Sequence, residues 1–261
     1  MPRFELSKWY ADCVTDDGAA FILYSAALRW RGPTIHYTSL LAHRSGHPTR
    51  TRVSLRRQPS PLATGRGIAW HSRSWRAEGS WFDKGLTHRE LLFDSGAGRL
   101  EWTCIAPHAV AEVRTGKERF CGWGYVEHLR LTLPPWRLPI QHLRWGRFIN
   151  AIDALVWIDW RGPYEKQVVY DGGVTVAARA IGDRQIVLAD GATVLSLDRP
   201  AVLREGALGA TALAVLPNLG RLFPAAFLRV RETKWLSRAT LHRPGCADST
   251  GMAIHEVVEW P

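Results

Sequence analysis

The feature that most constrains the fold is a succession of short apolar and aromatic runs separated by turn signals. Such runs recur along the chain, for example over 9–14, 20–30 and 35–41, and an Asp-Gly turn at Asp17-Gly18 joins the first two. Convincing helical periodicity is confined to short pieces. Turn spacings near ten residues favour antiparallel sandwiches or barrels. The sequence therefore predicts an all-β protein built from lipocalin-like antiparallel β-barrel or sandwich halves.

A chain of 261 residues can form one large domain or two small ones. Residues 9–30 read as a strand, a turn and a strand, and residues 154–179 repeat this alternation around an Asp-Gly-Gly turn. Because each pattern opens roughly half of the chain, we expect one half at 1–133 and another at 134–261. The boundary is expected between 120 and 150, with the segment at Pro134-Pro135 as a link or lid.

The chain lacks an apolar stretch approaching the ~20 residues that a spanning helix needs. Residues 1–8 also lack the apolar core of a signal peptide. A cytoplasmic protein, with peripheral membrane contact as a further option, is therefore expected. The four cysteines are scattered and are expected to be reduced, mostly buried thiols.

The positive charge is concentrated in one part of the sequence. The chain has 34 Lys and Arg against 24 Asp and Glu, a net charge of +10. The window between Asp17 and Glu78 contains no acidic residue and ten arginines, so the remainder of the chain is neutral (34 − 10 = 24 basic against 24 acidic). The whole excess therefore lies in this window.

Within the basic segment 44–76, residues 45–67 are rich in Ser, Thr, Pro, Gly and Arg, a composition typical of a long exposed connection. An anionic membrane surface, a phosphate-bearing ligand and nucleic acid are its candidate partners. Nucleic acid is disfavoured because the arginines do not lie on a recognisable reading helix or strand pair. The alternative is a solvated basic loop in an arginine-biased protein.

Familiar fingerprints of cofactor and metal chemistry are missing from the sequence. It has no GxSxG, GxxxxGK[ST], GxGxxG or HExxH pattern. His43 and His47 have helical spacing, but they flank Ser45-Gly46 in a loop-like stretch, so a zinc site is not expected. By elimination, the sequence favours chemistry without a cofactor or metal.

The candidate acid lies in a predicted strand over 123–133. Strand alternation places Trp123, Tyr125 and Glu127 on one face and His128 on the other. Glu127 is the single carboxyl on an otherwise apolar and aromatic face. We expect this face to line a dry, indole-lined hollow within the barrel, where burial would raise the pKa of Glu127 above about 4.3 and keep it protonated near neutrality. Together with Tyr125, such a carboxyl suits acid catalysis on an apolar substrate.

Two alternatives for this strand stay open. Glu127 could be a buried carboxylate that pairs with an arginine such as Arg144 or Arg147, which would give it a structural role. The strand could also have the opposite register, with His128 and Arg130 facing inward.

The run Gly124-Tyr125-Val126-Glu127, followed by prolines, Trp136 and Trp145-Gly146-Arg147-Phe148, resembles the central signature of the lipocalin-like carotenoid 1,2-hydratase and tocopherol cyclase family. The opening Trp9-Tyr10-Ala11-Asp12 is similar in kind. The resemblance implies a two-barrel β fold that acts without redox cofactors on isoprenoid or polyketide-like substrates, by hydration, cyclisation or pericyclic ring closure. It assigns catalysis to Tyr125 and Glu127. The family's Asn-Trp-Gly after the acid is replaced here by Leu129-Arg130-Leu131.

The chain has 13 tryptophans, an unusual number for its size. They could form a stacked core or a cage in which two or three aromatic faces stabilise a carbocation by about 0.5–2 kcal/mol each. A general acid alone supplies roughly 3–5 kcal/mol, so the mechanism would need both parts. The candidate substrate-binding side chains are Trp123, Trp136, Trp145, Trp157, Trp160 and His142. His128, His142 and Asp159 are candidates for relaying a proton or activating water.

Two functions follow from these observations. The first is a cofactor-independent enzyme that hydrates, isomerises or cyclises a hydrophobic small molecule, with Glu127 as acid and Tyr125 as its partner. The second is a non-catalytic lipocalin-like carrier, in which the same pocket holds a lipid and the basic segment meets an anionic membrane.

Overall fold

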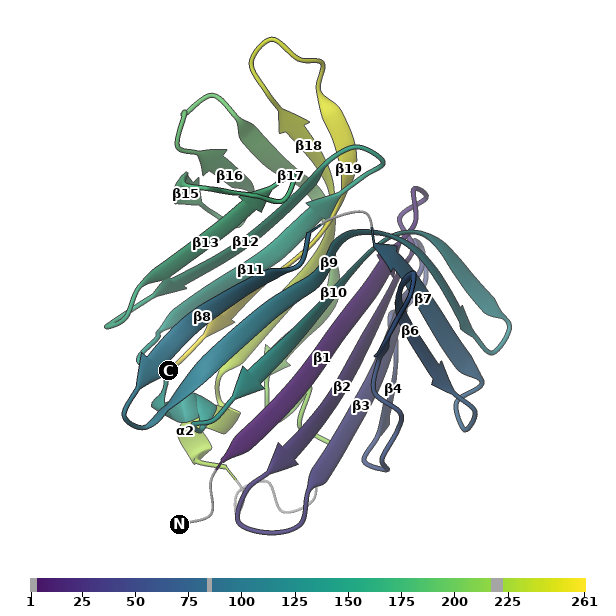
Figure 1. Cartoon of the computed structure of the whole chain (residues 1–261), viewed down its shortest axis with the longest axis vertical. Helices are drawn as coiled ribbons and strands as arrows, with labels where there is room; N and C mark the ends of the chain where they lie inside the picture. The colour runs from purple at the N-terminus through teal and green to yellow at the C-terminus, as the bar shows by residue number, and fades with distance from the viewer. Residues whose placement is uncertain (1–3, 84–85, 217–222) are drawn as a thin grey trace. The chain divides into compact units, whose positions relative to one another are not determined.

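The computed structural model describes residues 4–83, 86–216 and 223–261, and it is all-β, as the sequence predicts (Figure 1). Two compact units divide the chain, Met1–Leu138 and Pro139–Pro261. Within the described ranges, helix is confined to the single turns η1 (Pro135–Arg137) and α2 (Ala225–Leu228).

The first unit is an antiparallel sheet that curves around its own core. In the described residues its order is β4-β3-β2-β1-β10-β9-β7-β6-β5, with β8 also paired to β9. The strands are β1 (Glu5–Val14), β2 (Ala20–Arg29), β3 (Ile35–His43), β4 (Arg50–Ser54), β5 (Leu62–Thr64), β6 (Gly67–Ser72), β7 (Ala77–Asp83), β8 (His88–Ser95), β9 (Gly98–Thr115) and β10 (Glu118–Leu131).

The second unit repeats this topology. Its described strands follow the order β14-β13-β12-β11-β19-β18-β17-β16-β15, so the first strand of each unit pairs with the last one. The strands are β11 (His142–Ile149), β12 (Ala154–Arg161), β13 (Lys166–Asp171), β14 (Val174–Val176), β15 (Ala178–Ile181), β16 (Gln185–Leu188), β17 (Val194–Ala207), β18 (Arg231–His242) and β19 (Ser249–Glu259). Two antiparallel halves with one strand order confirm the predicted fold class.

Each unit has its own aromatic core. Phe21, Trp81 and Phe120 are fully buried in the first core, and Trp70 and Trp75 join them. In the second core, Phe148 and Trp157 pack against aliphatic side chains. Many indoles therefore stabilise the fold itself, since each aromatic side chain buries a large apolar surface.

Only one face of the central strands of the first unit contributes to this core. Ala11 and Cys13 of β1 and Val126 of β10 belong to the core cluster. Because successive side chains of a strand point to opposite faces, the neighbouring Tyr10, Asp12 and Glu127 lie on the other face. These three side chains are buried as well.

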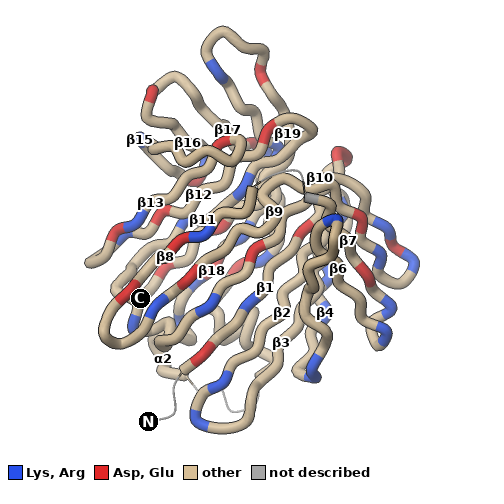
Figure 2. The backbone as a smooth tube through the Cα atoms, viewed as in Figure 1, with Lys and Arg blue, Asp and Glu red and all other residues tan. Residues whose placement is uncertain are grey.

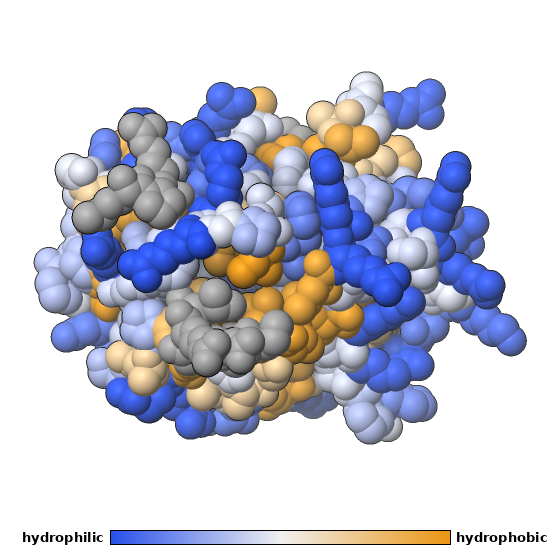
Figure 3. Space-filling model, turned by 90° about the horizontal axis from the view of Figure 1, so that it is seen from below, coloured by the Kyte–Doolittle hydropathy of each residue, from blue (hydrophilic) through white to orange (hydrophobic). Residues whose placement is uncertain are grey.

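None of the described helices is long and apolar enough to cross a membrane. Hydrophilic side chains cover much of the face shown in Figure 3, and an apolar patch remains between them. Single large apolar side chains are exposed elsewhere along the chain, among them Leu62, Leu86 and Ile152, as on most protein surfaces.

Candidate active site on the first sheet

Glu127 is a buried carboxyl that is held by hydrogen bonds. Glu127 is only 6% exposed to solvent. The Tyr125 hydroxyl donates to Glu127 Oε2 over 2.8 Å, and Trp102 Nε1 donates to the same oxygen over 2.6 Å. Both donors are uncharged groups. The structure therefore brings Tyr125 and Glu127 together, and it adds an indole donor from β9.

A second tyrosine–carboxyl pair lies beside the first. Asp12 of β1 is fully buried, and the Tyr10 hydroxyl donates to its Oδ2 over 2.8 Å. The register of β1 and β10 places Tyr10 opposite Glu127 and Asp12 opposite Tyr125. The two tyrosine rings lie 6.0 Å apart in an edge-on contact. Two Tyr-x-acid segments thus run antiparallel with their polar ends side by side.

Residues on the neighbouring strands continue this line of polar and aromatic side chains across the sheet. On one side, Tyr24 of β2 lies opposite Tyr10, with their rings 5.2 Å apart. On the other side, Cys104 of β9 lies opposite Glu127, and His88 of β8 lies opposite Cys104. Directly opposed residues project from the same face of a sheet. The face that carries Glu127 is therefore polar and aromatic across five adjacent strands.

Burial decides the protonation state of Tyr125. It raises the pKa of Tyr125 well above its usual value, and the nearby Cys104 and Glu127 act in the same direction. Tyr125 therefore remains a neutral O–H donor throughout the physiological range. A donor of this kind stabilises developing negative charge on the Glu127 carboxyl when that group loses a proton.

The site differs from the sequence-based expectation in two respects. We expected a hollow inside the barrel, but Glu127 lies on the face of the sheet opposite the core cluster. We also expected a single carboxyl on this face, and Asp12 supplies a second one. The first difference depends on how the sheet curves, and the second arises because β1 pairs with β10.

The other predicted residues of the first unit lie in separate places. Trp123 shares the face of Tyr125 and contacts His108, with ring centroids 5.6 Å apart. Trp136 lies in η1 and packs against Trp30 at 5.2 Å. His128 points to the opposite face from Glu127, where its Nε2 lies 2.8 Å from the Ser7 hydroxyl oxygen. The sheet therefore separates the His128 ring from the Glu127 carboxyl.

Burial, assisted by the charge of Arg130, lowers the pKa of His128. A neutral imidazole is consequently favoured at this position. Its ring lies against Trp9 at 4.7 Å, and Trp9 packs on the core cluster.

The predicted tryptophans of the second unit are all buried. Trp157 belongs to the core of that unit, and its ring covers Gly146. Trp145 lies under the ammonium group of Lys234, 5.2 Å from the ring centroid. Trp160 contacts Tyr164 at 6.2 Å. The core position of Trp157 matches the alternative in which indoles stabilise the fold.

His142 and Asp159 also belong to the second unit. His142 Nδ1 lies 3.8 Å from a carboxylate oxygen of Glu259. Asp159 is buried, and Arg161 holds both of its oxygens, through Nη2 at 2.9 Å and Nε at 3.1 Å. A carboxylate bound in this way is suited to a structural ion pair.

The two arginines considered as partners for Glu127 also lie in the second unit. Arg144 Nε binds Asp183 Oδ1 at 2.9 Å. The fully buried Arg147 donates to the carbonyl oxygen of Met252 at 3.2 Å.

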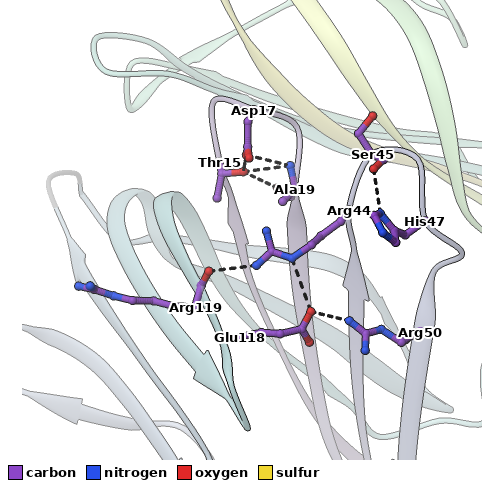
Figure 4. A network of polar contacts seen from close by, with 9 residues as sticks. All are labelled: Thr15, Asp17, Ala19, Arg44, Ser45, His47, Arg50, Glu118 and Arg119. Carbon is purple, nitrogen blue, oxygen red and sulfur yellow. Dashed lines mark hydrogen bonds and ion pairs between the residues drawn. The ribbon is translucent and has the colours of Figure 1, made fainter.

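The basic segment 44–76 runs from the end of β3 to the turn before β7, and Figure 2 shows basic positions at the strand ends around β4, β6 and β7. Arg44 binds the carbonyl oxygen of Arg119 and the Glu118 carboxylate, which Arg50 also binds at 2.5 Å (Figure 4). These side chains and His47 line a pocket of about 350 Å³. Part of the positive charge is therefore neutralised locally.

Sequence reasoning missed Asp12, Tyr10 and Trp102. A usable signal was present, since Tyr-x-acid spacing occurs at Tyr10-Ala11-Asp12 and again at Tyr125-Val126-Glu127. Alternation predicts that each tyrosine shares a face with its acid. Trp102 had no such signal, because only the pairing of β9 with β10 brings its indole to Glu127.

Within the described ranges, no group of three His, Cys, Asp or Glu side chains is arranged to hold a metal ion.

Comparison with known proteins identifies the fold. No protein-family model matches the chain, and no curated protein matches it. Among solved structures, CghA with Sch210972 is similar, with a TM-score of 0.61, 12% identity, and coverage of 98% of this chain and 89% of that one.

Two further structures are similar over nearly the whole chain. Kievitone hydratase from Nectria haematococca has a TM-score of 0.54 and 9% identity, with 97% of this chain and 88% of that chain covered. An AttH-like protein from Nitrosomonas europaea has a TM-score of 0.53 and 11% identity, with 98% and 92% covered. At these identities the likeness shows a shared fold.

Proposed function

We propose that this protein is a cofactor-independent enzyme that acts on a hydrophobic small molecule by acid-catalysed hydration, isomerisation or cyclisation. Glu127 is the proton donor and Tyr125 its partner. The observation that carries this proposal is the buried Glu127 carboxyl, which accepts hydrogen bonds from Tyr125 and Trp102. The shared fold of a kievitone hydratase and of CghA with Sch210972 supports the same class of activity.

The arrangement of donors suggests how the acid works. Both donors bind the Oε2 atom of the Glu127 carboxyl. Burial favours the neutral form of this carboxyl, whereas the donors favour the carboxylate that is left after proton transfer. The Tyr125 and Trp102 bonds therefore strengthen as negative charge develops on Glu127. This difference between ground state and transition state is what accelerates a reaction.

The substrate class follows from the surroundings of the acid. Tyr10, Tyr24 and Trp102 present aromatic rings on the face that carries Glu127. Aromatic faces stabilise a carbocation and bind apolar carbon skeletons. An isoprenoid or polyketide-like alkene is therefore the proposed substrate. The five neighbouring strands supply rigid positions for these groups.

The test compares the wild-type protein with Glu127→Gln on a panel of prenyl alcohols, carotenes and kievitone in deuterated water. Mass spectrometry detects the gain of one water, or deuterium incorporated without a change in composition. We expect turnover by the wild-type protein and a loss of about 10²–10⁴-fold in Glu127→Gln, because the amide cannot donate an acidic proton. Equal turnover by both proteins would overturn the role of Glu127.

Glu78→Gln is the matched control, since this carboxyl lies in the same unit and is half-exposed. It should retain wild-type turnover. A carrier would behave differently in the same assay. It would retain a panel compound on gel filtration, with the same affinity in Glu127→Gln, and would convert no panel compound.

A further inference from the structure

A basic pocket lies at one end of the first sheet, apart from Glu127. Its lining includes Arg44, His47 and Arg50, around the turn between β3 and β4, and Glu118 at the start of β10 (Figure 4). Glu127 follows Glu118 by nine positions along β10, which is about 30 Å in a strand. Strand alternation also places the two side chains on opposite faces. This pocket is therefore distinct from the candidate active site.

Arg44 is held in one orientation by its surroundings. Its Nη2 donates to the carbonyl oxygen of Arg119 over 3.2 Å, and its Nε lies 3.5 Å from Glu118 Oε1. Its guanidinium group also lies over the ring of Phe120, 4.7 Å from the centroid, and Phe120 is fully buried in the core cluster. A guanidinium that is oriented before binding loses little conformational freedom when a ligand arrives.

The two arginines and His47 retain hydrogen-bonding groups for a ligand. Arg50 Nη2 binds Glu118 Oε1 at 2.5 Å, the oxygen that Arg44 also contacts. Each guanidinium carries five N–H groups, and those outside these contacts have no acceptor among the described residues. His47 Nδ1 lies 3.2 Å from the Ser45 carbonyl oxygen, so its Nε2 is left for a ligand. The lining can therefore bind several oxygens of one group.

The charges that line the pocket favour an anionic ligand. Arg44 and Arg50 supply two positive charges and Glu118 one negative charge, so together they leave +1. His47 adds a further positive charge when its imidazole is protonated. Asp17, a second carboxylate near Arg44, accepts hydrogen bonds within its own turn (Figure 4). A group with one or two negative charges is therefore the best electrostatic match.

We propose that this pocket is a binding site for a phosphate monoester. Such a group carries a charge of about −1.5 to −2 near pH 7 and has three strongly accepting oxygens. It can accept hydrogen bonds from Arg44, Arg50 and His47 together, whereas a carboxylate offers only two oxygens. Ala42 and Pro48 present apolar surface to the carbon part of the ligand. The site is independent of the candidate acid and gives the protein a second binding function.

Isothermal titration calorimetry of the full-length protein tests the site with glycerol 3-phosphate, and glycerol is the comparison ligand. We expect saturable binding of the phosphate monoester and none of glycerol. Arg50→Gln should weaken binding about 10–100-fold, because charge-assisted hydrogen bonds are lost. Glu118→Gln should tighten it several-fold, since a carboxylate no longer competes for both guanidinium groups.

Arg56→Gln is the matched control. Arg56 is exposed, belongs to the same basic segment and does not line the pocket, so its replacement removes the same charge and should retain the affinity for glycerol 3-phosphate. Equal weakening in Arg50→Gln and Arg56→Gln would overturn the site, because it would leave net charge as the cause. Weaker binding in Glu118→Gln would overturn it as well.

The phosphate monoester belongs either to a soluble molecule or to a lipid headgroup, and vesicles distinguish the two sources. Vesicles with phosphatidic acid, whose headgroup is a phosphate monoester, are compared with phosphatidylserine vesicles of equal surface charge. A lipid source predicts tighter binding to phosphatidic acid and a loss of this preference in Arg50→Gln. A soluble source predicts that Arg50→Gln weakens binding of glycerol 3-phosphate alone. No dependence on Arg50 in either measurement would overturn the proposal.

Discussion

At the scale of single residues, burial controls which polar groups of this protein carry charge. It keeps Tyr125 a neutral donor beside Glu127 and favours neutral His128 on the opposite face. The strongest effect on a histidine is at His255 in the second unit, where burial and the charge of Lys234 lower the pKa to about 4. His255 Nε2 lies 2.9 Å from the Ser237 hydroxyl oxygen, and its ring stacks on Trp235.

The neutral state of His255 makes stability depend on pH. As the pH falls from about 6.5 towards 4, the unfolded chain gains a proton at this site and the folded protein does not. The contribution of His255 to the free energy of unfolding is therefore complete above pH 6.5. It is lost as the pH falls through this window, by roughly 3 kcal/mol at pH 4. Urea unfolding at pH 7, 5.5 and 4 should show a steeper loss for the wild-type protein than for His255→Gln. Equal pH slopes would contradict this prediction.

At the scale of elements, the site depends on the close pairing of β1 and β10. Trp81 Nε1 donates to the backbone carbonyl oxygen of Asp12 over 2.6 Å, which ties the core to the strand that carries the second carboxyl. Gly124 makes room for this bond. A Cβ at that position would lie 2.6 Å from Trp81 Cδ1 and 2.7 Å from the same carbonyl oxygen.

Gly124→Ala should therefore displace either the indole or β1. We expect a loss of about 1–3 kcal/mol in the free energy of unfolding, the range typical of overpacked cores. Chemical denaturation measures the loss. Gly65→Ala is the matched control in the same unit, because a Cβ there meets no atom within 4 Å. Similar stabilities of the two variants would show that Trp81 moves at little cost.

At the scale of the whole molecule, charge is unevenly distributed along the chain. The net charge of +10 resides in the acid-free window between Asp17 and Glu78. Within this window Arg44 and Arg50 bind Glu118, and Arg56, Arg57, Arg66 and Arg73 are exposed. The exposed arginines are the ones available to an anionic surface.

We predict that the protein binds vesicles containing phosphatidylserine and that binding weakens between low and high salt. Replacing Arg56, Arg57, Arg66 and Arg73 with glutamine should weaken it by about 1 kcal/mol for each arginine that meets the surface. The control replaces four exposed arginines of the second unit, Arg179, Arg184, Arg199 and Arg238. Co-sedimentation measures both sets. Equal weakening in the two sets would point to net charge alone, and salt-independent binding would remove the membrane proposal.

The sequence by itself determined the fold class, because turn signals and strand alternation are local properties that act within a few residues. For the same reason it placed Tyr125 and Glu127 on one face and His128 on the other, as the register of β10 shows. It did not reveal which face covers the core. That depends on how the sheet curves, so Glu127 was expected inside the barrel and lies opposite the core cluster instead.

Only the tertiary structure decided which groups meet Glu127. Asp12 and Tyr10 come from the first strand of the unit, Trp102 from β9, and strand pairing brings them to β10. Such pairing depends on contacts between residues far apart in the sequence, whose energies no local pattern contains. Glu127 could therefore be predicted as the acid from the alternation of its own strand. Its contacts with side chains of other strands could be identified only from the strand pairing of the tertiary structure.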